Sequence, residues 1–383
     1  MTIREIRIAV DGATGRLCRT QHLTKSLLAI RDEGGIELND GTRIVPVPLL
    51  LGRNPEKLSA LAAGMGNLDW SIDRAACFAD PTIEIYFDAS ATAGRVERAR
   101  EAIAAGKHIY LEKPIADSVG DALDLARRAA AMGLKNGTVQ DKLYLPGLRK
   151  VARLKNEGFF GSICSLRLNF GWWIFDGETV AAQRPSWNYM KVKGGGLILD
   201  MFPHWRYIIE HIAGPIRSVS CQARTRVPQR WDEQGMRYDV DVEDEVLATF
   251  GIEGGALAQI DSSWATRVRR DDLFSIQIDG SNGSAVAGLH QCFTQHLSDT
   301  PKPVWSVDIF EHQDFLGQWQ EVPDTEPLQN GYREGWAAFL SHVVADTDFR
   351  PTLMEGAKGV QLVEACHNSN AERRWIDLPD LSL

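Results

Sequence analysis

Residues 5–16 read Glu-Ile-Arg-Ile-Ala-Val-Asp-Gly-Ala-Thr-Gly-Arg, and this stretch decides the first half of the fold. Its first six residues are typical of a short β-strand, two glycines follow in a turn, and a helical pattern continues to about residue 30. A strand, a glycine turn and a helix bring backbone N–H groups and the positive end of the helix dipole to one point, where the pyrophosphate of a dinucleotide binds. We therefore predict a dinucleotide site at Gly12, Ala13, Thr14 and Gly15.

The turn departs from the usual Gly-x-Gly-x-x-Gly pattern of such sites. Glycines would be required at positions 12, 14 and 17, and Thr14 and Leu17 occupy the last two. What remains is a Gly-x-x-Gly variant, and a tight strand-to-helix turn without a ligand has the same appearance. The turn alone leaves both a cofactor site and a purely structural turn as interpretations.

The second strand is predicted over residues 44–51 and is followed by Gly52 and Arg53. In a sheet of this kind, the end of that strand faces the adenosine ribose. An acidic side chain there binds the 2′-hydroxyl of NAD, whereas an arginine favours the 2′-phosphate of NADP. Because glycine occupies the acidic position and an arginine follows it, we predict NAD(P) with a preference for NADP. The alternative is that Arg53 is a solvated arginine in a turn.

Strands and helices continue to alternate as far as residue 142. The pattern predicts strands at 83–88 and 108–111, helices at 94–105 and 119–132, and a further strand end near residue 140. Such alternation requires a parallel, doubly wound sheet of the Rossmann type, with ligands beyond the carboxyl ends of its strands. We therefore predict an α/β domain over residues 1–142. Its cofactor-binding residues, besides the glycine turn, are predicted to be Arg53, Ser90, Glu112, Lys113 and Gln140.

Composition excludes several classes of protein. The chain has 383 residues, enough for two domains, and a net charge of −9 that argues against binding nucleic acid or an anionic membrane. Its start reads as a strand without the apolar core of a signal peptide, and six scattered cysteines fit a reduced, cytoplasmic protein. We expect no metal site. The carboxylates of residues 241–245 are expected to form a solvated strand edge.

A second stretch is predicted to carry the chemistry. Residues 194–204 read Gly-Gly-Gly-Leu-Ile-Leu-Asp-Met-Phe-Pro-His. The glycines permit a positive φ or a close approach of the backbone to a ligand. Asp200 and His204 are four residues apart and share one face of the helix that follows, which Pro203 is expected to kink. A carboxylate beside an imidazole is a plausible acid–base pair, although a surface pair has the same spacing.

The second half of the chain is predicted to be rich in β-structure. Strands are predicted at 162–170, 216–223, 245–250, 256–261, 274–279 and 284–287, with hairpin turns at 251–255 and 280–283. This pattern predicts a second domain over residues 143–383, built on a large, mostly antiparallel open sheet.

Three segments together resemble one family. Ala-Gly-Lys-His at 105–108 leads into Glu112-Lys113-Pro114, the glycine run with Asp200 and His204 follows about 90 residues later, and residues 332–375 have the layout of the family's closing helices. This combination resembles the glucose–fructose oxidoreductase, inositol dehydrogenase and rhizopine-catabolism (Gfo/Idh/MocA) family over essentially the whole chain. Two departures are an insertion near residues 31–43 and Ser90-Ala91-Thr92 in place of Thr-Pro-Asn.

The resemblance implies an organisation and a function. It implies that the open sheet forms the interface of a homodimer or homotetramer, and that helices from about residue 332 return to pack on the Rossmann domain. It also implies hydride transfer between NAD(P) and a secondary alcohol of a sugar, polyol or sugar derivative. A small-molecule carbohydrate or glycoside is the expected partner, with no nucleic acid and no membrane.

Oxidation of a secondary alcohol requires a base that removes the hydroxyl proton. The predicted catalytic residues are Lys113, Asp200 and His204. His204 is a candidate base, and Lys113 either stabilises the reacting oxygen or itself takes the proton. Asp200 either orients His204 or binds a neighbouring hydroxyl. The predicted substrate-binding residues are these three together with Asp141, Trp172, Arg184 and Trp187.

Three other functions remain open from the sequence. One is oxidation of the sugar ring of a larger glycoside, for which tryptophans between residues 172 and 205 would supply apolar surface. Another is a tightly bound cofactor that a second sugar recycles. The third is a dinucleotide-binding regulator without turnover, against which the joint presence of Lys113, Asp200 and His204 argues.

Overall fold

The computed structural model describes residues 2–302, 308, 314–325, 327 and 329–383. The chain divides into two compact units, each described here by itself. The first comprises residues 1–144, 329–364 and 380–383, and the second comprises residues 145–328 and 365–379. The first division therefore falls after residue 144, two residues beyond the boundary expected from the sequence.

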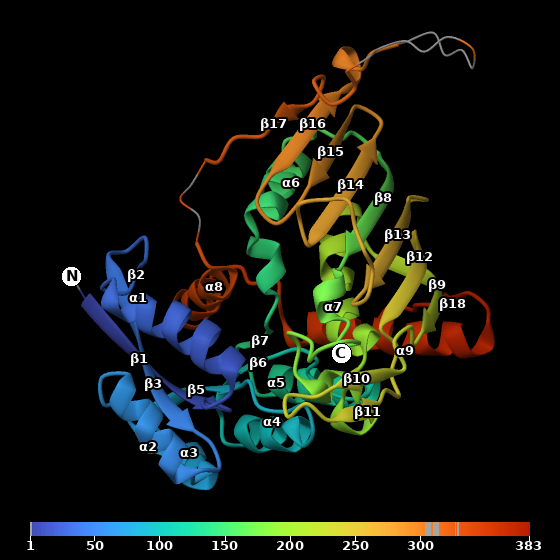
Figure 1. Ribbon diagram of the computed structural model, residues 1–383. Coiled ribbons are helices and arrows are strands. Elements are labelled where there is room, and N and C mark those ends of the chain that lie inside the picture. Colours follow the sequence, from blue (N-terminus) through green and yellow to red (C-terminus); the bar gives the residue numbers. More distant parts are fainter. Residues whose placement is uncertain (1, 303–307, 309–313, 326, 328) are drawn as a thin grey trace. The chain divides into compact units, whose positions relative to one another are not determined.

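A parallel sheet forms the centre of the first unit (Figure 1). The strands lie in the order β2-β3-β1-β5-β6-β7, with β4 also paired to β3. Every pair is parallel except β2 with β3. The bounds are β1 (Thr2–Asp11), β2 (Ile36–Glu37), β3 (Thr42–Leu51), β4 (Trp70–Ser71), β5 (Ile83–Asp88), β6 (His108–Leu111) and β7 (Asn136–Thr138).

This order confirms the predicted Rossmann fold. With the short antiparallel β2 set aside, β4-β3-β1-β5-β6-β7 is the arrangement of a doubly wound dinucleotide-binding sheet. The order reverses between β1 and β5, so the ligand crevice is expected beyond their carboxyl ends. The expected insertion near residues 31–43 contains β2, which pairs with the start of β3.

Helices cover both faces of this sheet. The helical elements are η1 (Cys18–Leu28), α1 (Ala29–Asp32), α2 (Pro55–Gly64), α3 (Arg74–Ala79), α4 (Arg95–Ala104), α5 (Val119–Ala131), the short η2 (Asp141–Tyr144), α8 (Gly331–Ala345) and α9 (Leu353–Glu372). Alternate residues of a strand face opposite sides. Accordingly Ile8 and Val10 of β1 pack in a core with η1, α2 and α8, whereas Ala9 packs in a second core with α3, α4, α5 and the start of α9.

The helix after the glycine turn differs from an ordinary α-helix. From Cys18 to Leu28 it is a π-helix, in which hydrogen bonds span five residues. Two hydroxyl groups follow the same spacing: Thr24 Oγ1 donates to the carbonyl of Arg19 at 2.9 Å, and Ser26 Oγ donates to that of Gln21 at 2.6 Å. Long π-helices are rare and associated with functional sites. The sequence predicted a helix here but not its wider winding.

Two prolines in β3 are tolerated because of their position. Pro46 and Pro48 pair with Ile6 and Ile8 of β1. On the other side of β3, β2 and β4 pair only with residues 43–44 and 50–51. Between these short neighbours the strand is an edge, where a missing N–H group costs no ladder hydrogen bond.

The second unit is built on a nine-stranded open sheet in the order β17-β16-β15-β14-β8-β13-β12-β9-β18 (Figure 1). All described pairs are antiparallel except β13 with β8, which confirms the predicted mostly antiparallel sheet. The strands are β8 (Ile163–Phe170), β9 (Ile216–Arg224), β12 (Glu245–Ile252), β13 (Leu257–Ser263), β14 (Phe274–Gly280), β15 (Gly283–Ala287), β16 (Cys292–His296), β17 (Gln320–Glu321) and β18 (Ile376–Asp377).

Helices cover one face of the open sheet. Helix α6 (Pro146–Asn156) contacts β15 and β16, and α7 (Leu197–Ala213) contacts β9, β12 and β13. Along β12, Val246, Ala248 and Phe250 are buried while Leu247 between them is exposed. The other face is therefore open in the single chain. The remaining elements are β10 (Gln229–Trp231), β11 (Arg237–Asp239), η3 (Trp173–Phe175), η4 (Ser186–Tyr189), η5 (Lys191–Lys193) and η6 (Leu297–Asp299).

Candidate active site

The glycine turn brings the ends of β1 and β5 together. Gly12 has φ +78°, and a Cβ there would lie 2.6 Å from the backbone nitrogen of Ser90. Its N–H group donates to Asp11 Oδ1 at 2.8 Å, and the N–H of Gly15 donates to the carbonyl of Gly12 at 2.9 Å. A helical turn then begins at Arg16. Thus only glycine fits at position 12, and the helix N-terminus follows directly.

Two buried carboxylates stand at this point of the sheet. Asp11 ends β1 and Asp88 ends β5, and the hydroxyl group of Tyr86 lies 2.9 Å from the first and 3.2 Å from the second. Arg74 pairs with Asp11 at 3.0 Å, and Arg98 donates to Asp88 at 2.8 Å. Burial raises the pKa of Asp88, but the guanidinium groups of Arg95 and Arg98 more than offset it, so the net pKa is lowered. Asp11 and Asp88 are not among the site residues predicted from the sequence.

Ser90, a predicted cofactor ligand, lies directly beyond β5. Its backbone N–H and its hydroxyl group donate to Asp88 Oδ1 at 2.8 and 2.6 Å, and Arg98 donates to its hydroxyl oxygen at 2.7 Å. The hydroxyl group is therefore engaged within the protein. Arg95 also donates to the carbonyl of Ser90 at 2.5 Å, which fixes the loop.

Gly52 and Arg53 follow the carboxyl end of β3, which is parallel to β1. The Arg53 side chain is exposed and has no hydrogen bond or ion pair with any part of the chain that the structure describes. A Cβ at Gly52 would lie 3.5 Å from the side chain of Leu58, an ordinary contact. The backbone at position 52 therefore has room for a Cβ atom.

Glu112 and Lys113 follow β6, and Gln140 and Asp141 follow β7. Lys113 is half-buried, and its backbone N–H donates to Glu112 Oε2 at 3.0 Å. The Lys113–Pro114 peptide bond is cis. Gln140 and Asp141 are buried. The fold therefore brings all the predicted cofactor residues, together with Asp141, to the carboxyl ends of β1, β3, β5, β6 and β7.

In the second unit, the glycine run begins helix α7. Gly194 and Gly196 have φ values of +75° and +119°. A Cβ at Gly195 would lie 2.4 Å from the carbonyl oxygen of Asn188, and one at Gly196 would lie 2.8 Å from Glu243 Oε1. The glycines are thus required by the protein's own packing. The Glu243 carboxylate also accepts the N–H of Ile198 at 2.8 Å, which caps the helix.

Asp200 and His204 lie on α7, each with a neighbour that the sequence analysis did not assign to it. Asp200 forms an ion pair with Arg184. His204 is buried, and its Nδ1 lies 2.6 Å from the hydroxyl oxygen of Tyr207, one turn further along the helix. Of the predicted substrate residues, the structure thus joins Arg184 to Asp200. The sequence does not indicate this role of Tyr207, because a tyrosine three residues after a histidine on a helix is equally explained by packing.

Aromatic rings support Arg184. Its guanidinium carbon lies 4.7 Å from the ring centre of Trp264 and 5.3 Å from that of Phe175. Trp172, just beyond β8, is half-buried and Trp187 in η4 is exposed. Within the described residues, no hydrogen bond is made by the buried Nε1 of Trp172. No contact joins either tryptophan to the Arg184–Asp200 pair among the described interactions.

The carboxylates of residues 241–245 form a solvated edge only in part: Asp241 is exposed, but Glu243 and Glu245 are half-buried and Asp244 is buried, so the expectation is wrong for Asp244. Asp241 accepts the N–H of Lys191 at 2.7 Å, and Glu243 caps α7. Asp244 is fully buried in an ion pair with Arg230 at 2.6 Å. Each carboxylate therefore satisfies a donor of its own. Among the described residues, no group of three or more His, Cys, Asp or Glu side chains is placed to hold a metal ion.

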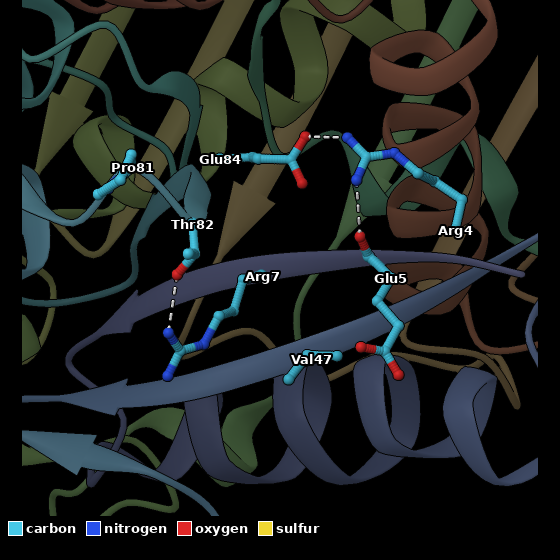
Figure 2. A pocket seen from close by; sticks show the side chains of 7 residues that line it. All are labelled: Arg4, Glu5, Arg7, Val47, Pro81, Thr82 and Glu84. Atoms are coloured by element: carbon cyan, nitrogen blue, oxygen red, sulfur yellow. Dashed lines mark hydrogen bonds and ion pairs between the residues drawn. The ribbon is translucent and has the colours of Figure 1, made fainter.

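A hollow of about 560 Å³ lies elsewhere, near the amino ends of β1 and β5 (Figure 2). Figure 2 shows Arg4 directed to Glu84 and Arg7 directed to Thr82 across it. Arg7 also pairs with Asp80 at 3.1 Å. Both arginines are thus bound to other side chains of the protein. The hollow lies toward the amino ends of the strands, whereas the predicted cofactor residues lie at their carboxyl ends. Separately, no helix within the described residues has the length and apolar character needed to cross a membrane.

Comparisons with known proteins agree with this arrangement. Residues 6–138 match the model of an oxidoreductase family with an NAD-binding Rossmann fold, and residues 148–286 match the GFO/IDH/MocA C-terminal domain. The chain is 48% identical over 382 residues to D-xylose dehydrogenase of Paenarthrobacter nicotinovorans, covering 99% of this chain and 98% of that protein. It is 23% identical to levoglucosan dehydrogenase of Pseudarthrobacter phenanthrenivorans, covering 86% and 88%.

Solved structures show the same fold. Levoglucosan dehydrogenase in complex with NADH and L-sorbose superposes with a TM-score of 0.81 at 19% identity, covering 98% of this chain and 99% of that one. A putative myo-inositol dehydrogenase from Sinorhizobium meliloti superposes with a TM-score of 0.69 at 18% identity, covering 98% and 100%.

The Asp88–Arg98 pair gives a prediction for acid stability. Because the pKa of Asp88 is lowered in the folded state, its contribution to stability is present above the unfolded pKa and is lost as the pH falls through the folded pKa. Arg98→Gln removes one guanidinium group, raises the pKa of Asp88 and should move the midpoint of acid unfolding upward by up to about one pH unit. Circular dichroism during acid titration measures this midpoint.

Lys57→Gln is the matched control, since Lys57 is an exposed cation of the same unit whose side chain has no described ion pair. A midpoint in Arg98→Gln that coincides with the control would contradict the assignment of Arg98 as a charge partner of Asp88.

Proposed function

The chain belongs to the Gfo/Idh/MocA oxidoreductase family, and we propose that it oxidises a secondary alcohol of a sugar with NAD(P), with D-xylose or a related aldopentose as substrate. One observation carries the substrate: the 48% identity with a D-xylose dehydrogenase runs through both units without a large gap in coverage. The proposed acid–base residues Lys113, Asp200 and His204 occur together in the chain, which supports an enzyme over a regulator without turnover.

The residues at the strand ends fit a dinucleotide. Gly12 places the start of a helix beyond β1, so that unpaired N–H groups of its first turn can face a pyrophosphate. Arg53 is exposed and available where the ribose of the adenosine is held in this fold. A bound nicotinamide would supply the acceptor for the hydride that leaves the substrate carbon. The chain's own residues must then handle the hydroxyl proton.

We propose that His204 is the base that accepts this proton. Its Nδ1 lies 2.6 Å from the hydroxyl oxygen of Tyr207, and we propose that Nδ1–H donates to that oxygen, which makes Nε2 the basic nitrogen. The ion pair with Arg184 keeps Asp200 a carboxylate, which suits it to accept a hydrogen bond from a substrate hydroxyl group. Lys113 donates to the reacting oxygen and stabilises its developing negative charge. Asp141, Trp172 and Trp187 are proposed to line the substrate site.

The exposed face of the open sheet supports a further proposal, a homodimer or homotetramer formed through that face. Leu247 on β12 and Leu257 on β13 are 55% and 53% exposed on adjacent strands. Apolar side chains on an otherwise polar sheet face are typical of subunit contacts. Light scattering of the purified chain decides between a monomer and these assemblies.

The substrate assignment predicts reduction of the cofactor by D-xylose. Purified protein incubated with NAD or NADP and a panel of aldopentoses, hexoses, inositol, levoglucosan and aryl glycosides should show rising absorbance of the reduced nicotinamide, with the highest kcat/KM for D-xylose or another aldopentose. Signal with glycosides alone would reject the pentose and support a larger substrate. Absence of signal with every sugar, despite measurable cofactor binding, would reject the proposed activity.

Replacement of the proposed base predicts a large loss of turnover. His204→Asn should lower kcat at least about 100-fold, the lower end of the effect of a positioned general base, and leave the Kd of the cofactor unchanged. Tyr207→Phe is the companion variant, since it retains the ring and removes only the partner of Nδ1, and its loss should be smaller. A near-normal rate in His204→Asn would transfer the role of base to Lys113.

The cofactor preference predicts an asymmetric effect at Arg53. Arg53→Ala should raise the Kd of NADP about tenfold or more, because a charge-assisted hydrogen bond to phosphate is lost, and change that of NAD less than about twofold. Gly52→Asp should favour NAD, since position 52 has room for a Cβ atom and a carboxylate there can accept a hydrogen bond from the ribose hydroxyl group.

Lys57→Ala is the control for these titrations, because it removes an exposed cation from the start of α2. Equal weakening of NAD and NADP by Arg53→Ala would contradict a role in recognising the 2′-phosphate.

A further inference from the structure

A histidine is enclosed in the core of the first unit. His22 lies in the π-helix η1, and its side chain is fully buried. Its ring centre is 4.5 Å from that of Phe87 and 4.9 Å from that of Tyr332. Burial of a polar ring among aromatic side chains is unfavourable unless both its nitrogen atoms have hydrogen-bond partners.

Both ring nitrogens have partners, and these fix the protonation state. The indole Nε1–H of Trp336 donates to His22 Nδ1 at 3.1 Å. An indole nitrogen is a donor only, so Nδ1 must be unprotonated. The proton is therefore on Nε2, which donates to Glu112 Oε1 at 2.9 Å. The imidazole is accordingly neutral and held in one tautomer by residues from two other elements.

The chain of hydrogen bonds ends at Lys113. The second oxygen of the buried Glu112 carboxylate accepts the backbone N–H of Lys113 at 3.0 Å. Arg95, also buried, donates to the carbonyl oxygens of Glu112 and Pro114 at 2.9 and 2.5 Å. The backbone on both sides of Lys113 is thus held by buried side chains, while Lys113 itself is half-buried.

We propose that His22 is a positioning residue: it holds the Glu112 carboxylate, through which it fixes the backbone of Lys113 and hence the direction of its ammonium group. This inference rests on the proposed function, because it assigns Lys113 a role in the reaction. Trp336 sets the tautomer of His22, so that Nε2–H always faces Glu112.

The winding of η1 and the long sequence separations explain why the sequence does not predict the hydrogen bonds of His22. His22 is 90 residues from Glu112 and 314 residues from Trp336 along the chain. In the sequence His22 is one polar residue of a helical stretch, and an α-helical periodicity assigns the wrong faces to a segment that is wound as a π-helix.

The first test measures the state of His22 without reference to activity. Nitrogen NMR of protein labelled at histidine, with the His22 signals assigned by their absence in His22→Gln, should show Nδ1 as the unprotonated nitrogen and Nε2 as the protonated one at neutral pH. Trp336→Phe keeps an aromatic ring and removes the donor, and it should release the tautomer. A His22 ring with its proton on Nδ1, or on both nitrogens, in the unsubstituted protein would overturn the proposal.

The second test measures catalysis with D-xylose and NAD(P). His22→Leu removes the donor to Glu112 and should lower kcat about 10- to 100-fold, the range expected when a catalytic group is misplaced, with the cofactor Kd changed less than about threefold. His22→Gln can still donate to Glu112 and should recover most of that loss. Ile30→Ala, at the end of the same helical segment and in the same core, is the control for destabilisation alone.

The pH profile separates positioning from simple packing. Burial raises the pKa of Glu112, and the hydrogen bond from His22 with the charges of Lys113 and Arg95 lowers it overall. Among the described residues, the buried Cys18 and Tyr110 also interact with the charge of this carboxylate. Without His22, Glu112 should take up a proton at higher pH and lose its hold on the Lys113 N–H, so the acidic limb of kcat/KM should move upward in His22→Leu and stay in place in Ile30→Ala.

The outcomes distinguish the two proposals. If the unsubstituted protein fails to reduce the cofactor with any sugar of the panel, the proposed function is rejected, and the positioning role with it. Active unsubstituted protein together with a folded His22→Leu variant of near-normal kcat and unchanged pH profile overturns the role of His22 alone.

Discussion

The meeting of two parallel strand ends is the constraint on which the first unit depends. Because β1 and β5 are adjacent and parallel, their final residues Asp11 and Asp88 bring two carboxylates into the interior at one point. The hydroxyl group of Tyr86 and the surrounding arginines compensate this buried charge. Gly12 then allows the loop beyond β1 to pack against the loop beyond β5, where a Cβ would collide with the backbone. The proposed dinucleotide site lies at this junction.

The same physical problem, a buried charge that needs partners, recurs in both units. Asp244 and Arg230 are both fully buried and are paired at 2.6 Å in the second unit. Removing either partner of such a pair leaves an uncompensated charge, which is strongly destabilising. Glu112 is compensated differently: a neutral imidazole and a backbone N–H group donate to it, and the charges of Lys113 and Arg95 lower its pKa. In the proposed mechanism the ammonium group of Lys113 also donates to the reacting oxygen.

The proposed catalytic residues Asp200 and His204 are each held by a partner side chain. Asp200 and His204 share a helix, yet the structure pairs the first with Arg184 and the second with Tyr207. Arg184 in turn lies over the ring of Trp264, which is fully buried. Positioning of a catalytic group within a fraction of an ångström requires such support, because a residue with loose neighbours samples unproductive orientations.

By itself, the sequence determined the parallel sheet, the open sheet and the residues at the strand ends, because hydrophobic period and glycine turns are local signals. The bounds of β5 and β6 were predicted to the residue. Only the tertiary structure decided the winding of η1, the hydrogen-bond partners of the 241–245 carboxylates, and the partners of Asp200, His204 and Glu112. These depend on contacts between residues far apart in the chain, as when Trp336 fixes His22, and no local pattern encodes which distant side chain completes a hydrogen bond.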